Sequence, residues 1–202
     1  MTIAGGMRKS PRQTNRFEGN DLRGNPCIGV LFALVLGGCA GPDKNEIALV
    51  NPGFEAPPQD NGTIPGWTTA QHAGPISYEM TIDRKVKAEG AASFRVTRKR
   101  EQVYGSVSQS VPAADLVGKT VELSAMLKTE GVGEKGWSLR LRPIGAEDST
   151  LTAGTLTGTT GFTRIAAKLQ IPQGTRELAI FATLKDGGSA WLDDVHLRIV
   201  EP

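Results

Sequence analysis

Cysteine, histidine and aromatic side chains are all scarce in this sequence. The two cysteines, Cys27 and Cys39, both lie near the N-terminus, so the rest of the chain cannot form an internal disulfide bond. The two histidines, His72 and His196, are far apart in the sequence, and no cysteine–histidine pair or Gly-x-Ser-x-Gly motif indicates a nucleophilic enzyme. No glycine-rich loop precedes a predicted helix, as a phosphate-binding enzyme requires. The sequence therefore predicts a protein that is not an enzyme.

The slight excess of positive charge comes from the N-terminal segment. The whole chain has a formal net charge of +2. Residues 1–38 contain five basic and two acidic residues, and their removal changes the net charge to −1. Because the remaining domain is nearly neutral, its composition gives no reason to expect nucleic acid as a partner.

The N-terminal segment has the organisation of a secretion signal. A basic stretch precedes the apolar run Ile28–Leu36, which is long enough for a signal peptide and too short to span a bilayer. The next residues, Leu36-Gly37-Gly38-Cys39, resemble the lipobox of bacterial lipoproteins, in which the cysteine thiol receives a diacylglycerol. The resemblance implies that residues 1–38 are a signal peptide and that Cys39 is lipidated. The alternative to lipidation is an ordinary secretory signal with an incidental cysteine. A second open point is the start of translation, which could be Met7 in place of Met1.

Lipidation of Cys39 would place the protein at the cell envelope. Several acyl chains hold a protein firmly to a membrane, because each buried methylene group contributes about 0.8 kcal/mol. Ala40 follows the cysteine, where Asp would be the usual signal for retention at the inner membrane. The resemblance therefore favours the outer membrane in a host that has one. Residues 39–45 are expected to form a short lipidated tether.

Apolar and polar residues alternate in short runs from Glu46 onward. A period of two is typical of a β-strand with one buried face. The clearest runs cover residues 93–97, 120–128, 137–143, 164–171 and 178–184. Turn-forming clusters separate them at residues 131–133, 154–161, 172–174 and 186–188. The pattern predicts an all-β antiparallel sandwich of about nine or ten strands, with at most one turn of helix at 113–117.

Four motifs follow one another along residues 46–200. They are Leu49–Glu55, Ile64–Trp67, the group formed by Gly90–Val96, Val107–Val111 and Leu123–Ala125, and Ala190–Val195. In this order and spacing they resemble the CenC-type carbohydrate-binding modules of families 4, 9 and 22. The resemblance implies a two-sheet, galactose-binding-like jelly roll over residues 46–202. It also implies sugar binding on a concave sheet face or at the end loops, and in many members a structural Ca²⁺ that ties the first strand to the last.

Asp193 is the acidic residue with the most informative position. It alternates in step with Trp191 and Val195, so it is expected to face the core with them. A buried carboxylate needs a cation or several hydrogen-bond donors, and Ca²⁺ takes six to eight oxygen ligands. The family resemblance implies Glu55 and Asp194 as further ligands of such an ion. The alternative is that Asp193 accepts backbone N–H bonds and closes a turn.

Sugar binding needs aromatic rings that stack on C–H faces and polar groups that bond hydroxyls. Trp67 lies where a long loop meets a strand, and Tyr104 shares a strand face with serines. Trp137 opens a strand whose other face carries Arg140 and Arg142, which could pair with hydroxyls or with acidic groups. These five residues are the candidate sugar contacts. The alternatives are that Trp67 packs in the core and that the arginines lie on a solvated strand face.

The sequence as a whole predicts a non-catalytic, lipid-anchored carbohydrate-binding module at the cell envelope. Its expected partners are a glycan and, through the N-terminal lipid, the membrane. The alternative is a jelly-roll scaffold that binds a protein or envelope component and no sugar, because this fold is reused for many purposes. The low aromatic content slightly favours the alternative.

Overall fold

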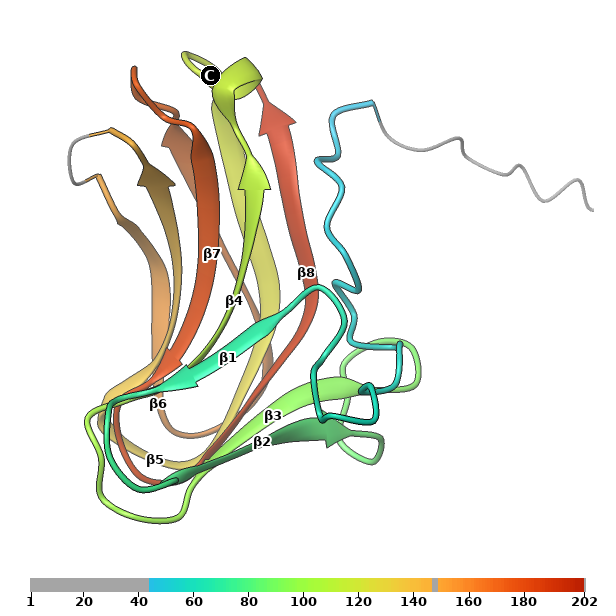
Figure 1. Ribbon diagram of the computed structural model, residues 1–202, viewed down its shortest axis with the longest axis vertical. Helices are drawn as coiled ribbons and strands as arrows, with labels where there is room; N and C mark the ends of the chain where they lie inside the picture. The colour runs from blue at the N-terminus through green and yellow to red at the C-terminus, as the bar shows by residue number, and fades with distance from the viewer. Residues whose placement is uncertain (1–43, 147–148, 202) are drawn as a thin grey trace, which may run out of the picture. The chain divides into compact units, whose positions relative to one another are not determined.

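The computed structural model describes residues 44–146 and 149–201, which belong to one unit of the chain, Ala40–Pro202 (Figure 1). The predicted signal peptide, Cys39 and most of the predicted tether lie outside the described residues. Within them, strands form an antiparallel two-layer sandwich, which confirms the predicted fold class. No helix in the described ranges is long and apolar enough to cross a bilayer.

Eight strands and one short 3-10 helix make up the sandwich. They are β1 (Thr68–Gln71), β2 (Tyr78–Asp83), β3 (Ser93–Arg98), β4 (Gly105–Pro112), η1 (Ala114–Leu116), β5 (Thr120–Ile144), β6 (Leu151–Gln170), β7 (Glu177–Leu184) and β8 (Ser189–Val200). The 3-10 turn η1 lies where the sequence predicted at most one helical turn.

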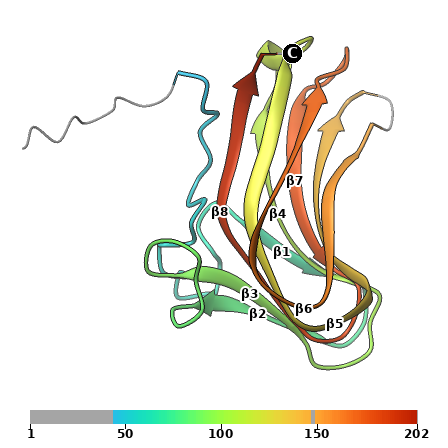
Figure 2. The ribbon, with the colours of Figure 1, turned by 180° about the vertical axis from the view of Figure 1, so that it is seen from behind.

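Two long strands, β5 and β6, belong to both layers. The first part of β5, residues 120–130, pairs with β8, and its last part, residues 137–144, pairs with β7. β6 pairs with both parts of β5. One layer therefore has the order β2-β3-β8-β5-β6, and the other has the order β1-β4-β7-β5-β6. Figure 2 shows β5 and β6 curving together where they pass from one layer to the other.

The expected number of nine or ten strands was too high. The glycine clusters at 131–133 and 154–161, predicted as turns, lie inside β5 and β6. Gly131 and Gly158 adopt positive φ values of 61° and 67°, and the pairing of the two strands shifts register around them. Glycine adopts this backbone conformation without steric cost, so the strands bend at irregular pairings and do not end there.

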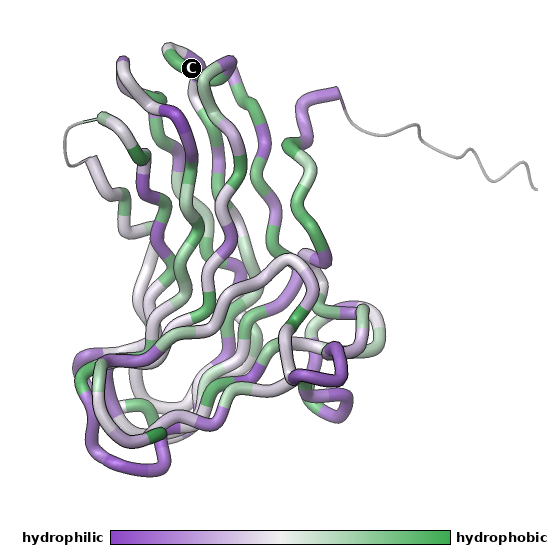
Figure 3. Tube along the Cα trace, in the orientation of Figure 1, coloured by the Kyte–Doolittle hydropathy of each residue, from purple (hydrophilic) through white to green (hydrophobic). Residues whose placement is uncertain are grey.

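The core lies between the two layers and follows the predicted alternation. Val121, Leu123 and Leu127 of β5 are fully buried, as are Leu178 and Ile180 of β7. Figure 3 shows the matching alternation of hydrophobic and hydrophilic positions along the strands. Burial of these side chains is the main source of stability, because no disulfide bond is available to this part of the chain.

Strand β8 contains a bulge that changes which side chains face the core. The pairing with β5 shifts register near Asp193, and Asp194 has a φ of 48°. Leu192 and Val195 both lie in the core as a result, whereas Trp191 lies beside Lys128, whose Nζ is 4.7 Å from the ring centroid. Trp191 is buried, at 3% exposed, but it does not share a direction with Val195 as expected, because an inserted residue reverses the alternation.

The N-terminal part of the described chain runs beside β8 (Figures 1 and 2). The Ile47 N–H donates to the Leu197 carbonyl at 2.8 Å, and the Ile199 N–H donates to the Asn45 carbonyl at 2.8 Å. β3 pairs only with residues 189–192 of β8, so this segment covers the edge that β3 leaves open. Covering that edge satisfies backbone groups that would otherwise be free to pair with another chain.

Candidate ligand-binding site

The outer face of the layer β1-β4-β7-β5-β6 carries a row of hydroxyl groups. Residues of β4 and β7 alternate between the core and the outer face, which directs Ser106, Ser108 and Thr183 outward, although Ser106 and Thr183 are largely covered there. The strand register pairs Ser106 with Thr183, and Thr183 in turn with Ser138 of β5. Neighbouring strands therefore place short polar side chains side by side across this face.

Two adjoining pockets lie on this face, and we call them together the sheet groove. The first, of about 390 Å³, is lined by Ala70, Tyr104, Ser106, Ser108, Arg140, Phe181, Thr183 and Lys185. The second, of about 280 Å³, is lined by Arg140, Arg142, Thr150 and Phe181. Because Arg140 and Phe181 line both pockets, the two form one continuous depression along the sheet.

Arg140 occupies the junction of the two pockets. Its Nη2 donates a hydrogen bond to Oγ1 of Thr183 at 2.9 Å, which fixes the guanidinium over β7. Its Nε is buried and has no hydrogen-bond partner among the described residues. A buried donor without an acceptor costs about 1–3 kcal/mol, and such groups usually bind water or a ligand. Arg140 is therefore positioned by the sheet and has one donor left for a ligand oxygen.

Phe181 lines both pockets, although it is not among the residues predicted from the sequence. The run 178–184 was interpreted from its apolar parity, Leu178, Ile180 and Leu184, which the structure buries. Phe181 lies on the opposite parity and is partly exposed in the groove. An aromatic residue on the solvent-facing parity of a strand was the signal that could have identified it.

The structure brings three of the five predicted sugar contacts together. Tyr104 and Arg140 line the first pocket, and Arg142 lines the second. The ring of His72 meets Tyr104 edge-on at a centroid distance of 5.9 Å and supports its position. The outer face of β5, which carries both arginines, thus becomes part of a groove, because β5 pairs with β7 and β7 pairs with β4.

The two predicted tryptophans do not reach the groove. Trp137 is fully buried, and its Nε1 donates to the Trp191 carbonyl at 3.1 Å. Trp67 is 3% exposed, its Nε1 donates to the Asn51 carbonyl at 3.0 Å, and its ring lies 4.9 Å from that of Phe54. Neither indole can stack on a ligand without unpacking the core. Large aromatic rings at the start of a strand are more strongly stabilised by such burial than by exposure.

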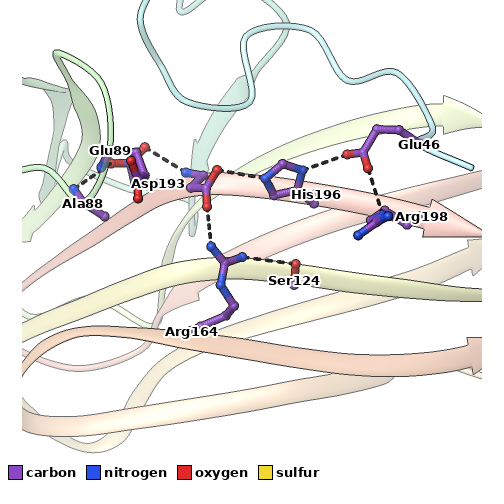
Figure 4. A network of polar contacts seen from close by, with 9 residues as sticks. Glu46, Ala88, Glu89, Ser124, Arg164, Asp193, His196 and Arg198 are labelled. Carbon is purple, nitrogen blue, oxygen red and sulfur yellow. Dashed lines mark hydrogen bonds and ion pairs between the residues drawn. The ribbon is translucent and has the colours of Figure 1, made fainter. Parts of the chain in front are cut away.

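Asp193 is fully buried, as expected, although the alternation with Trp191 and Val195 on which that expectation rested is broken by the bulge, and it accepts three backbone hydrogen bonds. Its Oδ2 accepts the N–H groups of Ala88 at 2.8 Å and Glu89 at 3.1 Å, and its Oδ1 accepts the Asp194 N–H at 2.8 Å (Figure 4). Burial raises the pKa of Asp193, although the three hydrogen bonds oppose this. The carboxylate therefore fixes the loop between β2 and β3, which is the alternative role that the sequence left open.

Glu55 converges on the same loop from the start of the domain. Both of its carboxylate oxygens accept the Ala91 N–H, at 2.9 and 3.0 Å. A Cβ built on Gly53 would lie 3.8 Å from Glu55 Oε1 and 3.9 Å from Asp193 Oδ1, so both carboxylates flank this glycine. Carboxylate oxygens are ligands that Ca²⁺ prefers, but two carboxylates are too few for an ion that takes six to eight oxygens, so further oxygens would have to come from the backbone or water. Among residues 44–146 and 149–201, no group of three His, Cys, Asp or Glu side chains fits a metal ion.

Asp194 does not join the other two predicted metal ligands. Its Oδ2 forms an ion pair with Arg164 of β6, and its Oδ1 bonds Nε2 of His196 at 2.8 Å. The positive φ of Asp194 within the bulge turns its side chain away from the loop that Asp193 holds. Although burial opposes the change, the bonds from Arg164 and His196 lower the pKa of Asp194. Asp194 is therefore part of a surface network and not of a metal site.

His196 links that network to the N-terminal segment. Its Nδ1 lies 2.8 Å from Oε1 of Glu46, and Oε2 of Glu46 lies 3.3 Å from Nε of Arg198 (Figure 4). Burial lowers the pKa of His196, but its bonds to Glu46 and Asp194 outweigh burial and raise it. The acidic and basic side chains on this face thus neutralise one another.

Comparison with known proteins shows similarity over part of a longer relative. No protein-family model matches the chain. A curated relative, the uncharacterized HTH-type transcriptional regulator YbfP of Bacillus subtilis (strain 168), is 30% identical over 144 residues, which are 67% of this chain and 48% of that protein. The chain thus spans about half the length of the curated relative that it matches.

Solved structures share the fold at low sequence identity. The CBM22-1 xylan-binding domain from Paenibacillus barcinonensis Xyn10C is 17% identical with a TM-score of 0.51, over 74% of this chain and 92% of that one. TmCBM61, solved with β-1,4-galactotriose, is 15% identical with a TM-score of 0.52, over 78% and 100%. The Stig cyclase Fisc from Fischerella sp. TAU is 15% identical with a TM-score of 0.59, over 78% and 99%. Binding modules and a cyclase share this jelly roll, so function has to be argued from the site.

Proposed function

We propose that this chain is a non-catalytic carbohydrate-binding module and that the sheet groove is its binding site. The observation that carries the proposal is the unpartnered, buried Nε of Arg140 between an aromatic ring and a row of hydroxyl groups. A fixed donor beside a flat apolar surface matches the alternation of hydroxyl groups and C–H faces on a sugar ring. The similarity in fold to xylan- and galactotriose-binding modules supports the proposal.

Binding in the groove would combine stacking with hydrogen bonds. Phe181 offers the ring face, and Tyr104 borders the first pocket with an edge that can donate and accept a hydrogen bond. Ser108 supplies a partly exposed hydroxyl group that can bond a sugar hydroxyl in either direction, whereas Ser106 and Thr183 are buried and their hydroxyl groups bond the Ala70 carbonyl and Arg140. The pocket volumes fall near the lower end of the usual range for small-ligand sites, which suits a shallow site open to a glycan chain.

The composition of the groove supports binding without catalysis. Glycoside hydrolysis uses a pair of carboxyl groups on either side of the bond that is cut. No Asp or Glu side chain lines either pocket within the described part of the chain, from which Glu147 and Asp148 are excluded. Asp193 and Asp194 are held by the β2–β3 loop and by Arg164 and cannot act as such a pair.

We also propose that Cys39 is lipidated and anchors the module at the cell envelope, at the outer membrane in a host that has one. The lipobox-like sequence Leu36–Cys39 carries this proposal. Expression in a lipoprotein-processing bacterium tests it: the native chain should enter the membrane fraction and incorporate labelled palmitate, whereas Cys39→Ser should do neither. Equal palmitate labelling of both chains would contradict lipidation at this residue.

We further propose that Glu55 and Asp193 hold a structural Ca²⁺. Support comes from the convergence of these carboxylates on Gly53 and on one loop, from opposite ends of the domain. When bound, the ion would supply positive charge to a buried carboxylate and tie the two chain ends together. Asp194 is not part of this proposal.

A glycan array tests the main proposal. The full chain carrying Cys39→Ser, which cannot be lipidated, should bind a restricted set of glycans, and Phe181→Ala should weaken that binding strongly with the melting temperature nearly unchanged. Lys168→Ala, an exposed substitution on β6 in the other layer, is the matched control and should bind normally. If the array shows no binding, the sugar-binding proposal fails and the scaffold alternative takes its place.

A further inference from the structure

The sheet groove is lined by positive side chains without acidic ones. Arg140, Arg142 and Lys185 contribute three cations to the two pockets. Among the described lining residues there is no Asp or Glu. Acidic side chains lie beyond the ends of the groove. Glu177 pairs with Ile144, two residues beyond Arg142, and Glu101 lines a separate pocket with Lys185, but neither lines the groove. The groove is therefore a continuous region of positive charge.

Some basic residues elsewhere in the sandwich have acidic partners, which the three groove cations lack. Arg98 pairs with Asp186, Lys99 with Glu79, and Arg164 with Asp194. No ion pair among the described residues involves any of the three groove cations. A positive region that the protein does not neutralise attracts an anion, and shaped surfaces strengthen this attraction.

The geometry around Arg140 fits an anionic group attached to a sugar. The guanidinium is planar, and its Nη2 is already bonded to Thr183. Its buried Nε has no acceptor, and a carboxylate or sulfate oxygen satisfies such a donor better than a hydroxyl group does, because charge-assisted hydrogen bonds are stronger. Arg142 lies two residues along the same strand and on the same face, so it extends this donor surface into the second pocket.

We infer that the sheet groove selects anionic glycans, whose rings carry carboxylate or sulfate groups, over neutral ones. This inference rests on the proposed sugar-binding function and adds the class of sugar to it. The ring stacks on Phe181, the anionic group bonds Arg140, and Arg142 and Lys185 contribute a longer-range attraction that salt weakens.

The test compares charged glycans with their neutral counterparts. The full chain carrying Cys39→Ser is titrated with polygalacturonate, which carries only carboxylates, and with a sulfated galactan, which carries only sulfates. Each is matched by the same polymer after carboxyl reduction or desulfation. We expect one charged polymer to bind at least about tenfold more tightly than its neutral counterpart, and which one does so identifies the anion. Raising the salt concentration should weaken that binding.

Two variants separate the charge from the stacking surface. Arg140→Gln should lose about 10–100-fold in affinity for the charged polymer and little for the neutral one, as expected when a charge-assisted hydrogen bond is removed. Arg84→Gln combined with Lys85→Gln removes two exposed charges from the β2–β3 loop and should leave binding unchanged. Melting curves of all variants confirm that each is folded.

The possible outcomes distinguish the inference from the proposed function. Phe181-dependent binding of neutral polymers that equals or exceeds binding of charged ones would overturn the inference and leave sugar binding intact. Binding that Arg140→Gln does not weaken would also overturn it. If neither these polymers nor an array of neutral and acidic glycans shows any binding, the proposed function and the inference both fail.

Discussion

The two outer faces of the sandwich arrange their charged side chains in opposite ways. On the layer β2-β3-β8-β5-β6, Asp194 bonds Arg164 and His196, and Glu46 bonds His196 and Arg198. Acidic and basic groups there meet one another, and the N-terminal segment takes part. On the other layer, the cations of the sheet groove face solvent without acidic partners among the described residues.

The aromatic rings of the two faces differ in the same way. Trp191 lies on the first face, but Lys128 and Arg95 cover its ring, and its Nε1 donates to Asp83 at 3.0 Å. Phe181 lies on the second face with part of its ring open to the groove. One face therefore satisfies its own chemistry, while the other leaves a ring and a donor for a ligand. Unsatisfied groups on a surface identify a binding face better than the type of residue alone.

The largest expected effect comes from the buried carboxylate of the first face. Asp193→Ala removes the acceptor of three backbone N–H groups, and unsatisfied buried donors cost about 1–3 kcal/mol each. We expect a loss of about 3 kcal/mol or more in the free energy of unfolding, measured by urea denaturation. Asp194→Ala, whose carboxylate is more exposed, should lose less than about 1 kcal/mol. Equal losses would contradict the distinct roles assigned to the two residues.

Removal of the proposed Ca²⁺ should have the next largest effect. Bound Ca²⁺ at about 100 times its dissociation constant stabilises the folded state by about 2.7 kcal/mol. Excess EDTA should therefore lower the melting temperature by several degrees. Glu55→Gln should remove this response, whereas a substitution in the sheet groove such as Arg142→Gln should keep it. A melting curve that is insensitive to EDTA would exclude a tightly bound structural ion.

Loss of the exposed ring should change binding and leave stability nearly intact. Phe181→Ala should weaken glycan binding by at least about tenfold, since stacking and aromatic contact are worth on the order of 1 kcal/mol or more. Phe181→Leu keeps apolar area without a flat ring, so a loss similar to that of alanine indicates stacking. Isothermal titration calorimetry measures both. If leucine binds as well as phenylalanine, simple apolar contact explains the site.

The smallest expected effect is a pH dependence confined to the first face. The folded pKa of His196 is raised above its unfolded value, near 6.5, by the bonds to Glu46 and Asp194, so the protonated form stabilises the fold. Its contribution is complete below about pH 6.5 and is lost as the pH rises through the raised folded pKa. Asp194 has a lowered pKa and stays charged over this range.

Chemical denaturation between pH 6 and pH 8.5 measures this effect. The decrease in the free energy of unfolding should be below about 1 kcal/mol, because His196 is more than one-third exposed and solvent screens its contacts. His196→Gln should make the free energy of unfolding independent of pH over the same interval. A dependence that survives this substitution would have to come from another group.

The sequence predicted the strands and the core well because burial follows a period of two. The predicted alternation of Leu123, Leu139 and Ile180 is the one that the structure buries. The same rule failed at Trp191, because a bulge inserts one extra residue and the alternation of residue types does not show where this happens. It also failed to show that β5 and β6 continue through their glycine clusters, since glycine ends a strand as readily as it bends one.

The candidate site was predicted in part. Arg140, Arg142 and Tyr104 were selected from the polar parity of their strands, and the structure brings them together. Trp137 alternates in step with Leu139, so the sequence pattern already predicted its burial. It was a candidate sugar contact only because tryptophan rings commonly stack on sugars. Phe181 could be recognised as part of the site only from the strand pairing that places it beside Arg140, because the register between distant strands does not follow from the local sequence.

The long β5–β6 hairpin has a consequence for how the domain opens. Because both strands belong to both layers, neither layer can separate from the other without breaking the hairpin. Unfolding should therefore be a single cooperative event, and folding should be slow, since most pairings join residues far apart in the sequence. A ligand in the sheet groove would then protect amide hydrogens of β8 from exchange, although β8 contributes no side chain to the groove.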